Sequence, residues 1–450
     1  MRDLLLVATV LGLVPFILRR PHVGVLTYAW LSYMNPHRLT WGFAHDLPFA
    51  QAVMAVTLAG LVLTCLRERP VPAMSGAAWL LLAFAAWVTL TTQFAKVPDQ
   101  AAAKWDTVMK IMLVTFLTLG LFREPARIRQ LVWVIALSVG FYGVKGGLAT
   151  LATAGGEHVV GPPSTFIEDN NALALALVMA TPLLYWCAMS APRRWLRLSL
   201  LAAVGLNVLG VLGTYSRGGL LALAAMGTVL WLYSRNKLAT GALVLSLGLL
   251  GLFLMPGEWL DRMNSIGGYE QDESAQERLR AWDFAKAQAA ERPLIGGGFK
   301  VFALNTQDKG ANGEDALNAH SIYYEVLGEH GYPGLCLFLA FLLATLWAAG
   351  SAARGARERD DLAWAALLGR SLQAVLAGYA VGGAFLTLGF FDLYYHLAAV
   401  ALLTRLAVRQ APAAAGEPET RPFTPPSPWP ITVPGFVGRT WPAPGGENGS

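Results

Sequence analysis

Apolar residues in this chain come in long blocks, and short stretches with charged or turn-forming residues separate the blocks. Many blocks approach the ~20 residues that a helix needs to cross a ~30 Å hydrocarbon core. They do not alternate with period two, as the strands of a membrane barrel would. Because a bilayer core offers backbone amides no water, such blocks predict transmembrane helices. We expect these helices near residues 3–18, 22–34, 50–66, 76–94, 105–122, 128–152, 171–190, 195–213, 218–234, 238–255, 321–349, 362–389 and 392–408.

The fold class that follows is an all-α integral membrane protein with about twelve transmembrane helices. The first two segments are short, and we count them as one broken crossing. Hydrophobic residues make up 55% of the 450 residues and charged residues only 14%, whereas a soluble protein has about a quarter of its residues charged. The 46 glycines and 25 prolines suit a packed bundle with broken helices.

Lys and Arg residues are unevenly divided between the two sets of short loops, with thirteen in one set and four in the other. Cytoplasmic loops of membrane proteins carry the excess of positive charge, so the first set is predicted to be cytoplasmic. The net charge of +5 mostly reflects this bias and does not argue for nucleic acid as a partner. The thirteen are Arg67, Arg69, Arg123, Arg127, Arg129, Arg193, Arg194, Arg197, Arg235, Lys237, Arg354, Arg357 and Arg359, and the four are Arg38, Lys96, Lys104 and Arg217.

The chain is therefore predicted to have four parts. Residues 1–255 form the amino-terminal transmembrane helices, and residues 256–320 form one large outer loop. Residues 321–408 form the carboxy-terminal transmembrane helices. The tail at 409–450 is cytoplasmic and rich in Pro, Ala and Gly without an apolar period, so we expect it to be disordered.

The large outer loop is far longer than an ordinary connection, and loops of that length tend to be functional. It contains seven Lys or Arg and eleven Asp or Glu residues. Ser274 and Glu277 have the spacing of a capping box, which predicts a helix that lies on the membrane surface or packs on the bundle and ends at Pro293. Its predicted apolar stripe is Ala275, Leu279, Trp282, Ala285 and Ala289.

A second outer loop covers residues 153–171, and its Gly-Pro-Pro run suggests a shaped lid or wall.

Arg217 lies in "GTYSRGGLLALA", between two apolar helices at the outer boundary. A cation there is costly unless it is paired or faces water. One interpretation is an anion clamp assisted by the amino terminus of the following helix; the other is an interfacial arginine that snorkels to water. Lys145, in "FYGVKGG", could likewise reach a phosphate or snorkel.

Arg278 and Arg280 lie near the start of the predicted loop helix, where cations oppose the helix macrodipole. An anionic ligand would remove that conflict. The alternative is pairing with Glu277 and Asp283 on a solvated face. The residues alone do not choose between the two arginines.

His320 comes just before a predicted membrane helix, at the end of the large loop. Its ordinary pKa near 6.5 suits a general base near neutral pH, although a single histidine is more often structural. Tyr324 follows four residues later on the same helix face. Glu325 could orient a partner or satisfy a helix contact, and His330 is a weaker alternative base.

Metal and nucleotide sites are not indicated. Glu270 and Asp272 could hold a divalent ion, but a solvated acidic run that favours the start of the next helix explains them better. The sequence has no Walker A motif, Rossmann fingerprint or GxSxG. We therefore expect no metal and no cofactor.

Several motifs resemble the O-antigen ligase/polymerase superfamily: "TYSRGG" at an outer helix end, "ERLRAWDFAKAQAAERPLIGGGFKVF" in the long loop, and then "NAHSIYYEVLGEHGYPGL". The segments "LSYMNPHRLTWGFAHDLPFA" and "GPPSTFIEDNNALALAL" are similar, more narrowly, to exosortase-associated O-glycosylation ligases. The resemblance covers nearly all of residues 1–408. Each motif is short, and their order and topology make the resemblance specific.

The resemblance implies a GT-C-type membrane glycosyltransferase that works without metal. It would transfer a glycan from undecaprenyl diphosphate to a lipid A–core acceptor on the periplasmic face of the bacterial inner membrane, as an O-antigen ligase of lipopolysaccharide biosynthesis. Arg217 would match the family's essential arginine, Arg278 or Arg280 its loop arginine, and His320 its catalytic histidine. Ser321 stands where many relatives have asparagine, and Asn318 lies close by.

Four other functions remain open on the sequence. The same donor could serve a protein O-oligosaccharyltransferase or an O-antigen polymerase. A transporter of lipid-linked glycans would be indicated by inverted repeats and broken helices at the midplane, which are not evident. A scaffold for an export machine would keep glycan transfer intact after mutation of the candidate site.

Overall fold

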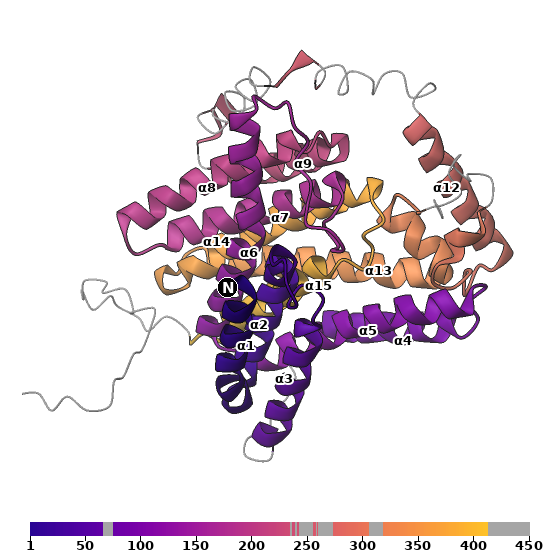
Figure 1. The fold of residues 1–450 in the computed structure, drawn as a ribbon, viewed down its shortest axis with the longest axis horizontal. Coiled ribbons are helices and arrows are strands. Elements are labelled where there is room, and N and C mark those ends of the chain that lie inside the picture. Colours follow the sequence, from indigo (N-terminus) through magenta and orange to yellow (C-terminus); the bar gives the residue numbers. More distant parts are fainter. Residues whose placement is uncertain are drawn as a thin grey trace, which may run out of the picture. The chain divides into compact units, whose positions relative to one another are not determined.

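The computed structural model describes residues 1–65, 75–234, 236–238, 241–242, 255–257, 259, 273–305 and 318–412. Every long regular element in these ranges is helical (Figure 1). The α-helices are α1 (Arg2–Arg19), α2 (Pro21–Met34), α3 (Phe49–Cys65), α4 (Gly76–Thr92), α5 (Pro98–Leu121), α6 (Pro125–Ala152), α7 (Asn170–Ser190), α8 (Arg194–Gly213), α9 (Arg217–Tyr233), α12 (Glu273–Glu291), α13 (Ile322–Gly355), α14 (Ala363–Gly382) and α15 (Asp392–Gln410). Short 3-10 turns are η1 (Pro36–Leu39), η3 (Val301–Leu304), η5 (Asp360–Leu362) and η6 (Gly383–Phe385).

Most predicted segments coincide with helices, and the departures have local causes. Helix α5 begins at Pro98 because a proline at the first position and Asp99 in the first turn start a helix. Lys104 therefore lies inside α5, although it was assigned to a short loop. Helix α14 ends at Gly382, so residues 386–391 are non-helical where a helix to 389 was expected. The predicted segment 238–255 and the tail from 413 onward lie largely or wholly outside the described residues.

Helices α1 and α2 are two antiparallel helices rather than one broken crossing. The chain breaks at Arg20, which has φ −139° and ψ 83°. Asp3, at the start of α1, accepts a hydrogen bond from the backbone N–H of Ala44 at 3.1 Å, beyond the end of α2. The start of α1 thus lies beside the segment that follows α2, and the two helices form a hairpin.

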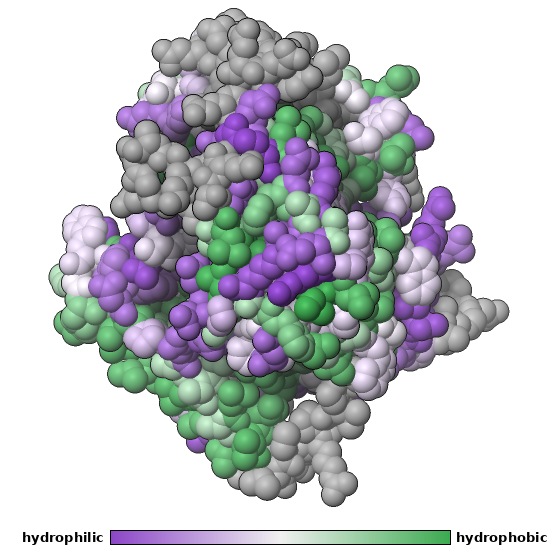
Figure 2. All heavy atoms as spheres, turned by 90° about the vertical axis from the view of Figure 1, so that its right-hand side faces the viewer, coloured by the Kyte–Doolittle hydropathy of each residue, from purple (hydrophilic) through white to green (hydrophobic). Residues whose placement is uncertain are grey.

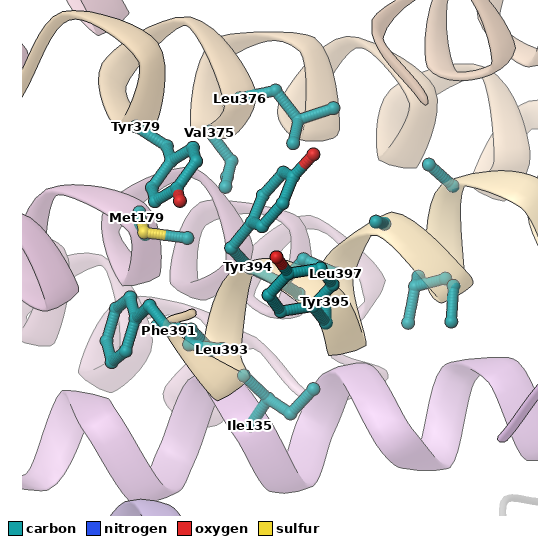
Figure 3. Close-up of a cluster of buried hydrophobic side chains, with 14 of the residues drawn as sticks. Ile135, Met179, Val375, Leu376, Tyr379, Phe391, Leu393, Tyr394, Tyr395 and Leu397 are labelled. Carbon is teal, nitrogen blue, oxygen red and sulfur yellow. The ribbon is translucent and has the colours of Figure 1, made fainter. Parts of the chain in front are cut away.

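Helices α7 and α15 form the centre of the bundle. In α7, 89% of the most apolar 18-residue window is buried. Figure 3 shows Tyr394 and Tyr395 of α15 pointing into a cluster with Tyr379 of α14 and Met179 of α7. The Tyr379 and Tyr394 rings are stacked, with centroids 4.3 Å apart and an interplanar angle of 7°. A core of this kind needs helices that are apolar on most of their surface.

Four described helices are long and apolar enough to cross a membrane: α6, α7, α8 and α13. Parts of α3, α4 and α9 are shorter apolar helices. Helix α8 exposes large apolar side chains, among them Trp195 at 60% and Leu198 at 57%, as a lipid-facing helix would. The chain is thus a multi-pass α-helical membrane protein, while the number of crossings stays a prediction.

The loops with few Lys and Arg residues contact one another. The Lys96 N–H donates to the Gly297 carbonyl, and the Val159 N–H donates to the Gly213 carbonyl, both at 2.8 Å. Asn35, Ile167 and Asp392 line one small cavity, so the end of α2 and the start of α15 lie beside the second outer loop. The loops that the charge count assigned to the outer side therefore meet in the structure.

The arginine-rich loops form a second group. The Arg129 guanidinium lies 5.4 Å from the centroid of the Trp364 ring, and the Trp186 indole N–H donates to the Trp364 carbonyl at 2.9 Å. His22 and Phe122 are in edge contact with ring centroids 6.2 Å apart. These contacts bring together the chain around Arg129, Trp186 and Trp364, while the division of all the loops between two sides and the compartment that each side faces stay predictions.

We expect Gly147→Ala to destabilise the protein by about 1–3 kcal/mol, because α6 and α8 approach too closely for a side chain there. A Cβ at Gly147 would lie 2.0 Å from the Leu206 carbonyl oxygen. Thermal unfolding in detergent measures the effect. Gly205→Ala on α8 is the matched control, since a Cβ there has no heavy atom within 4 Å; an equal loss in both variants would contradict the packing argument.

Candidate functional site

Arg217 is the first residue of α9, at the end of a tightly bonded turn. Ser216 caps the helix: its hydroxyl accepts from the Gly219 N–H at 3.0 Å and donates to the Asn171 side-chain oxygen at 2.7 Å. Arg217 is half-buried. The predicted arginine is therefore held at a helix amino terminus, where the macrodipole adds partial positive charge.

A second helix begins at the same place. Asp169 caps α7, because its carboxylate accepts from the backbone N–H groups of Asn171 (2.8 Å) and Ala172 (3.1 Å). The Asn170 side chain donates to the Thr214 carbonyl at 2.8 Å. Together with the Ser216–Asn171 bond, this contact brings the amino termini of α7 and α9 together. Two positive helix ends therefore lie beside Arg217.

Tyr215, directly before this turn, has the left-handed backbone conformation with φ 58°. Its hydroxyl donates to the Gly155 carbonyl at 2.5 Å. Its ring packs on His158 with centroids 4.1 Å apart. A bulky residue in this region costs of order 1–3 kcal/mol, so the contacts with the second outer loop stabilise the turn that presents Arg217.

His320 lies just before α13 and also has a left-handed backbone, with φ 46°. Its N–H donates to the Thr387 hydroxyl at 2.9 Å. Burial lowers the pKa of His320 below its ordinary value, the nearby Arg278 guanidinium lowers it further, and the Asp169 carboxylate partly offsets both. His320 thus lies close enough to Arg278 and to Asp169 for both charges to act on its pKa, and the lowered pKa favours a neutral imidazole at pH 7.

The two loop arginines differ in their surroundings. Arg278 is half-buried and its charge lowers the pKa of His320, whereas Arg280 is exposed. Of the two, Arg278 is thus the one whose charge acts on His320, whereas which of them contacts the donor stays a prediction.

Helix α12 packs on the start of α13. The Trp282 indole N–H donates to the Ala319 carbonyl at 3.1 Å, and its ring is stacked on Tyr324 with centroids 5.1 Å apart. The predicted helix is confirmed, but one part of its apolar stripe was wrong. Leu279 is 39% exposed, and Ala281 is buried instead, in line with Ala285 and Ala289. Small alanines let α12 approach α13 closely, which a leucine would prevent.

The segment after α12 is bonded to a break in α13, at which Gly331 has φ 69° and Pro333 has no N–H to donate. The carbonyls of Gly328 and Glu329 instead accept from the N–H groups of Gly297 and Gly298, both at 2.8 Å. The Tyr332 N–H donates to the Pro293 carbonyl at 2.9 Å. We call these three hydrogen bonds the α13 clasp. They fix the carboxy-terminal end of α12 to α13.

Other predicted residues lie elsewhere or have structural contacts. Lys145 is exposed on α6, and its glycine neighbour Gly147 packs on α8. Asn318 is exposed beside His320. Glu325 is buried in an ion pair with Lys104. His330 is fully buried, and its Nδ1 is 2.7 Å from the Thr91 hydroxyl, so it is a core histidine.

Glu270 and Asp272, the carboxylates considered for metal, lie outside the described residues.

Asp169 is the group near His320 that the sequence analysis missed. The signal was present, because "EDNN" before an apolar run is typical of a helix amino terminus.

The side of the molecule that carries α12 is polar. Figure 2 views this side and shows hydrophilic side chains across its middle, with hydrophobic surface below them. Six non-glycine residues in the described ranges have positive φ, and all six lie in loops that the sequence analysis predicted to be on the outer side: Asn35, Ala154, Ser164, Tyr215, Lys300 and His320. Strained backbone is typical of functional sites, so this end of the bundle is the place to expect one.

Two family models match the chain. Residues 1–191 match a family of unknown function, DUF5935. Residues 202–339 match the O-antigen ligase family, and this range contains Arg217, Arg278, Arg280 and His320. No curated protein matches the chain.

We expect Arg278→Gln to raise the pKa of His320, because the substitution removes a nearby positive charge. Arg280→Gln should leave that pKa unchanged, since Arg280 is exposed. Hydrogen exchange at the histidine C2 position, followed by mass spectrometry across pH, measures the pKa without any substrate. Equal shifts in both variants would remove the distinction between the two arginines.

Proposed function

We propose that this chain is an O-antigen ligase, a proposal supported by the match of residues 202–339 to the O-antigen ligase family. It transfers a glycan from undecaprenyl diphosphate to a lipid A–core acceptor. The reaction takes place on the periplasmic face of the bacterial inner membrane, by a metal-independent inverting mechanism in a GT-C-type fold.

The observation that carries this proposal is the meeting of charged groups from three separate parts of the chain. His320 lies near Arg278 and Asp169. Asp169 caps the helix whose amino terminus is bonded to the turn that holds Arg217. A general base, cations and two positive helix ends are thereby gathered in one region, as a lipid diphosphate substrate requires.

The cations stabilise the leaving group. Negative charge grows on the diphosphate as its bond to the sugar breaks, and fixed positive groups stabilise that charge without reorganisation of solvent. One guanidinium group can donate two hydrogen bonds to two oxygens of the same phosphate, whereas a lysine ammonium acts as a point charge. Arg217 and Arg278 have this role in the proposal, and the amino termini of α7 and α9 add partial charge.

His320 activates the acceptor. Its lowered pKa keeps the imidazole neutral at pH 7, so it can take the proton of an acceptor hydroxyl. The hydroxyl oxygen then bonds to the anomeric carbon on the face opposite the diphosphate, and the bond between that carbon and the diphosphate oxygen breaks. The proton remains on His320. The Asp169 carboxylate stabilises the imidazolium, because it raises the pKa of His320.

The bilayer supports this chemistry because both substrates are lipids. Confinement to one leaflet raises their local concentration and limits their orientations. Exposed apolar side chains on α8 suit a chain embedded among the same lipids.

We expect Arg217→Ala and His320→Ala each to reduce glycan transfer below about one hundredth of the wild-type rate. The assay uses purified protein with an undecaprenyl-diphosphate-linked glycan and lipid A–core. Arg197→Ala is the matched control, because Arg197 is exposed in the first turn of α8. Retained transfer in the His320 variant would remove the base assignment.

The same assay separates the alternatives. Transfer to a peptide serine or threonine would indicate a protein O-oligosaccharyltransferase, and transfer to a second lipid-linked glycan would indicate a polymerase. Movement of the donor across vesicles without any transfer would indicate a transporter.

The pH dependence of transfer should report the surroundings of His320. We expect the rate to rise with pH through an apparent pKa below the ordinary value of about 6.5. Asp169→Asn should move this rise to still lower pH, because the variant loses the negative charge that stabilises the imidazolium. Asparagine keeps the helix cap. A profile that moves to higher pH would contradict the role given to Asp169.

A further inference from the structure

Outside the candidate site, the described residues contain a buried cluster of one ammonium and two carboxylates. Lys104 Nζ lies 2.8 Å from Glu325 Oε1, and 2.8 Å and 2.9 Å from the two carboxylate oxygens of Glu329. The side chains are 17%, 3% and 2% exposed. The same ammonium lies over the rings of Phe299 and Phe390, at 5.3 Å and 5.2 Å from their centroids. Lys104 therefore has four partners, two on α13 and one in each of two loops.

Such a cluster is costly to bury, and the cost is offset only by good geometry and full hydrogen bonding. Two carboxylates outnumber one ammonium, so a purely stabilising cluster would be better built from apolar residues of similar size. The other hydrogen bonds of Glu325 and Glu329 show which segments of the chain the cluster holds in place.

The Glu329 arm holds the segment that follows α12. Glu329 Oε1 accepts from the Lys300 N–H at 2.8 Å, where Lys300 has φ 61°. Lys300 comes two residues after the α13 clasp. Lys104 thus secures the segment that anchors α12, the helix on which Arg278 lies.

The Glu325 arm holds the loop beside His320. Glu325 Oε2 accepts from the Gly389 N–H at 2.8 Å, and the Tyr395 hydroxyl donates to the Gly389 carbonyl at 2.9 Å. Two residues earlier in the same loop, the Thr387 hydroxyl accepts from the His320 N–H. Lys104 thus also secures the loop that fixes the His320 backbone.

We propose that Lys104 is a positioning residue for glycan transfer, which sets the distance between His320 and Arg278 through its two carboxylate partners. The role of Lys104 in glycan transfer rests on the proposed function. The structural linkage, from Lys104 through its carboxylate partners to the Gly389 loop and the Lys300 segment, does not. Lys104 makes none of its recorded contacts with either site residue, so its effect passes through the Gly389 loop and the Lys300 segment. The substrate class is the same as in the proposed function, a glycan linked to a lipid diphosphate.

The test compares four proteins with the wild type. Lys104→Met leaves two buried carboxylates unpaired and is expected to fold poorly. The triple variant Lys104→Met/Glu325→Gln/Glu329→Gln removes all three charges but keeps carbonyl acceptors for the Lys300 and Gly389 N–H groups, so it should fold. Lys104→Arg is the conservative variant. Lys110→Met is the matched control, because Lys110 pairs with Asp106 on the exposed surface of the same helix.

The first measurement is hydrogen exchange of the backbone amides, which needs no substrate. In the triple variant we expect faster exchange at both Lys300 and Gly389, at least about tenfold. The Lys110 variant should match the wild type. Unchanged exchange at both amides in the folded triple variant would overturn the linkage.

The second measurement is steady-state transfer per folded molecule. We expect kcat of the triple variant to fall about a hundredfold, because displacement of reacting groups by ~1 Å costs about that much. Lys104→Arg keeps the positive charge and should retain at least a tenth of the wild-type kcat. Its thermal stability should lie within the range of the other folded variants. Wild-type kcat in the folded triple variant would overturn the positioning role. If the wild type itself transfers no glycan, the proposed function fails, whereas the exchange result still decides the linkage.

Discussion

The site depends on a broken helix whose freed carbonyls are satisfied by another part of the chain. Little water reaches the backbone inside a membrane protein. Each carbonyl that a helix break releases therefore needs another hydrogen-bond donor. At Gly331 and Pro333 the carbonyls of Gly328 and Glu329 receive the N–H groups of two glycines that follow α12. The break in α13 is thus also the anchor of α12, and the position of the helix that carries Arg278 follows from it.

Much of the fold could be predicted from sequence because its determinants are local. Apolar blocks predicted most helices to within a few residues. The capping residues Asp169 and Ser216 act within three residues of themselves, so they were readable in principle. Leu279 was misplaced because periodicity identifies an apolar face but not the size of side chain that the neighbouring helix requires.

The rest of the site could not be predicted, because it depends on contacts between distant segments. Lys104 and Glu329 are 225 positions apart, and nothing near Lys104 indicates its partners. His320 and Arg217 were suggested by motif resemblance, whereas the convergence of Asp169 and Arg278 on His320 appears only in three dimensions. Of the predicted donor-binding residues, Lys145 on α6 and Arg280 on α12 are exposed, and no recorded contact among the described residues links Lys145 to this group.

The geometry of α12 makes one weak contact matter more than its energy suggests. The helix is fixed near Pro293, and Arg278 lies about 22 Å away along its axis at 1.5 Å per residue. A tilt of only ~10° about that anchor would move Arg278 by ~4 Å, which is more than the length of a hydrogen bond. The Trp282–Ala319 hydrogen bond and the stacking of Trp282 on Tyr324 limit this tilt, four residues from Arg278 along α12. A hydrogen bond worth about 1 kcal/mol therefore has a large effect on where the Arg278 charge lies, because it acts far from the point at which α12 is fixed.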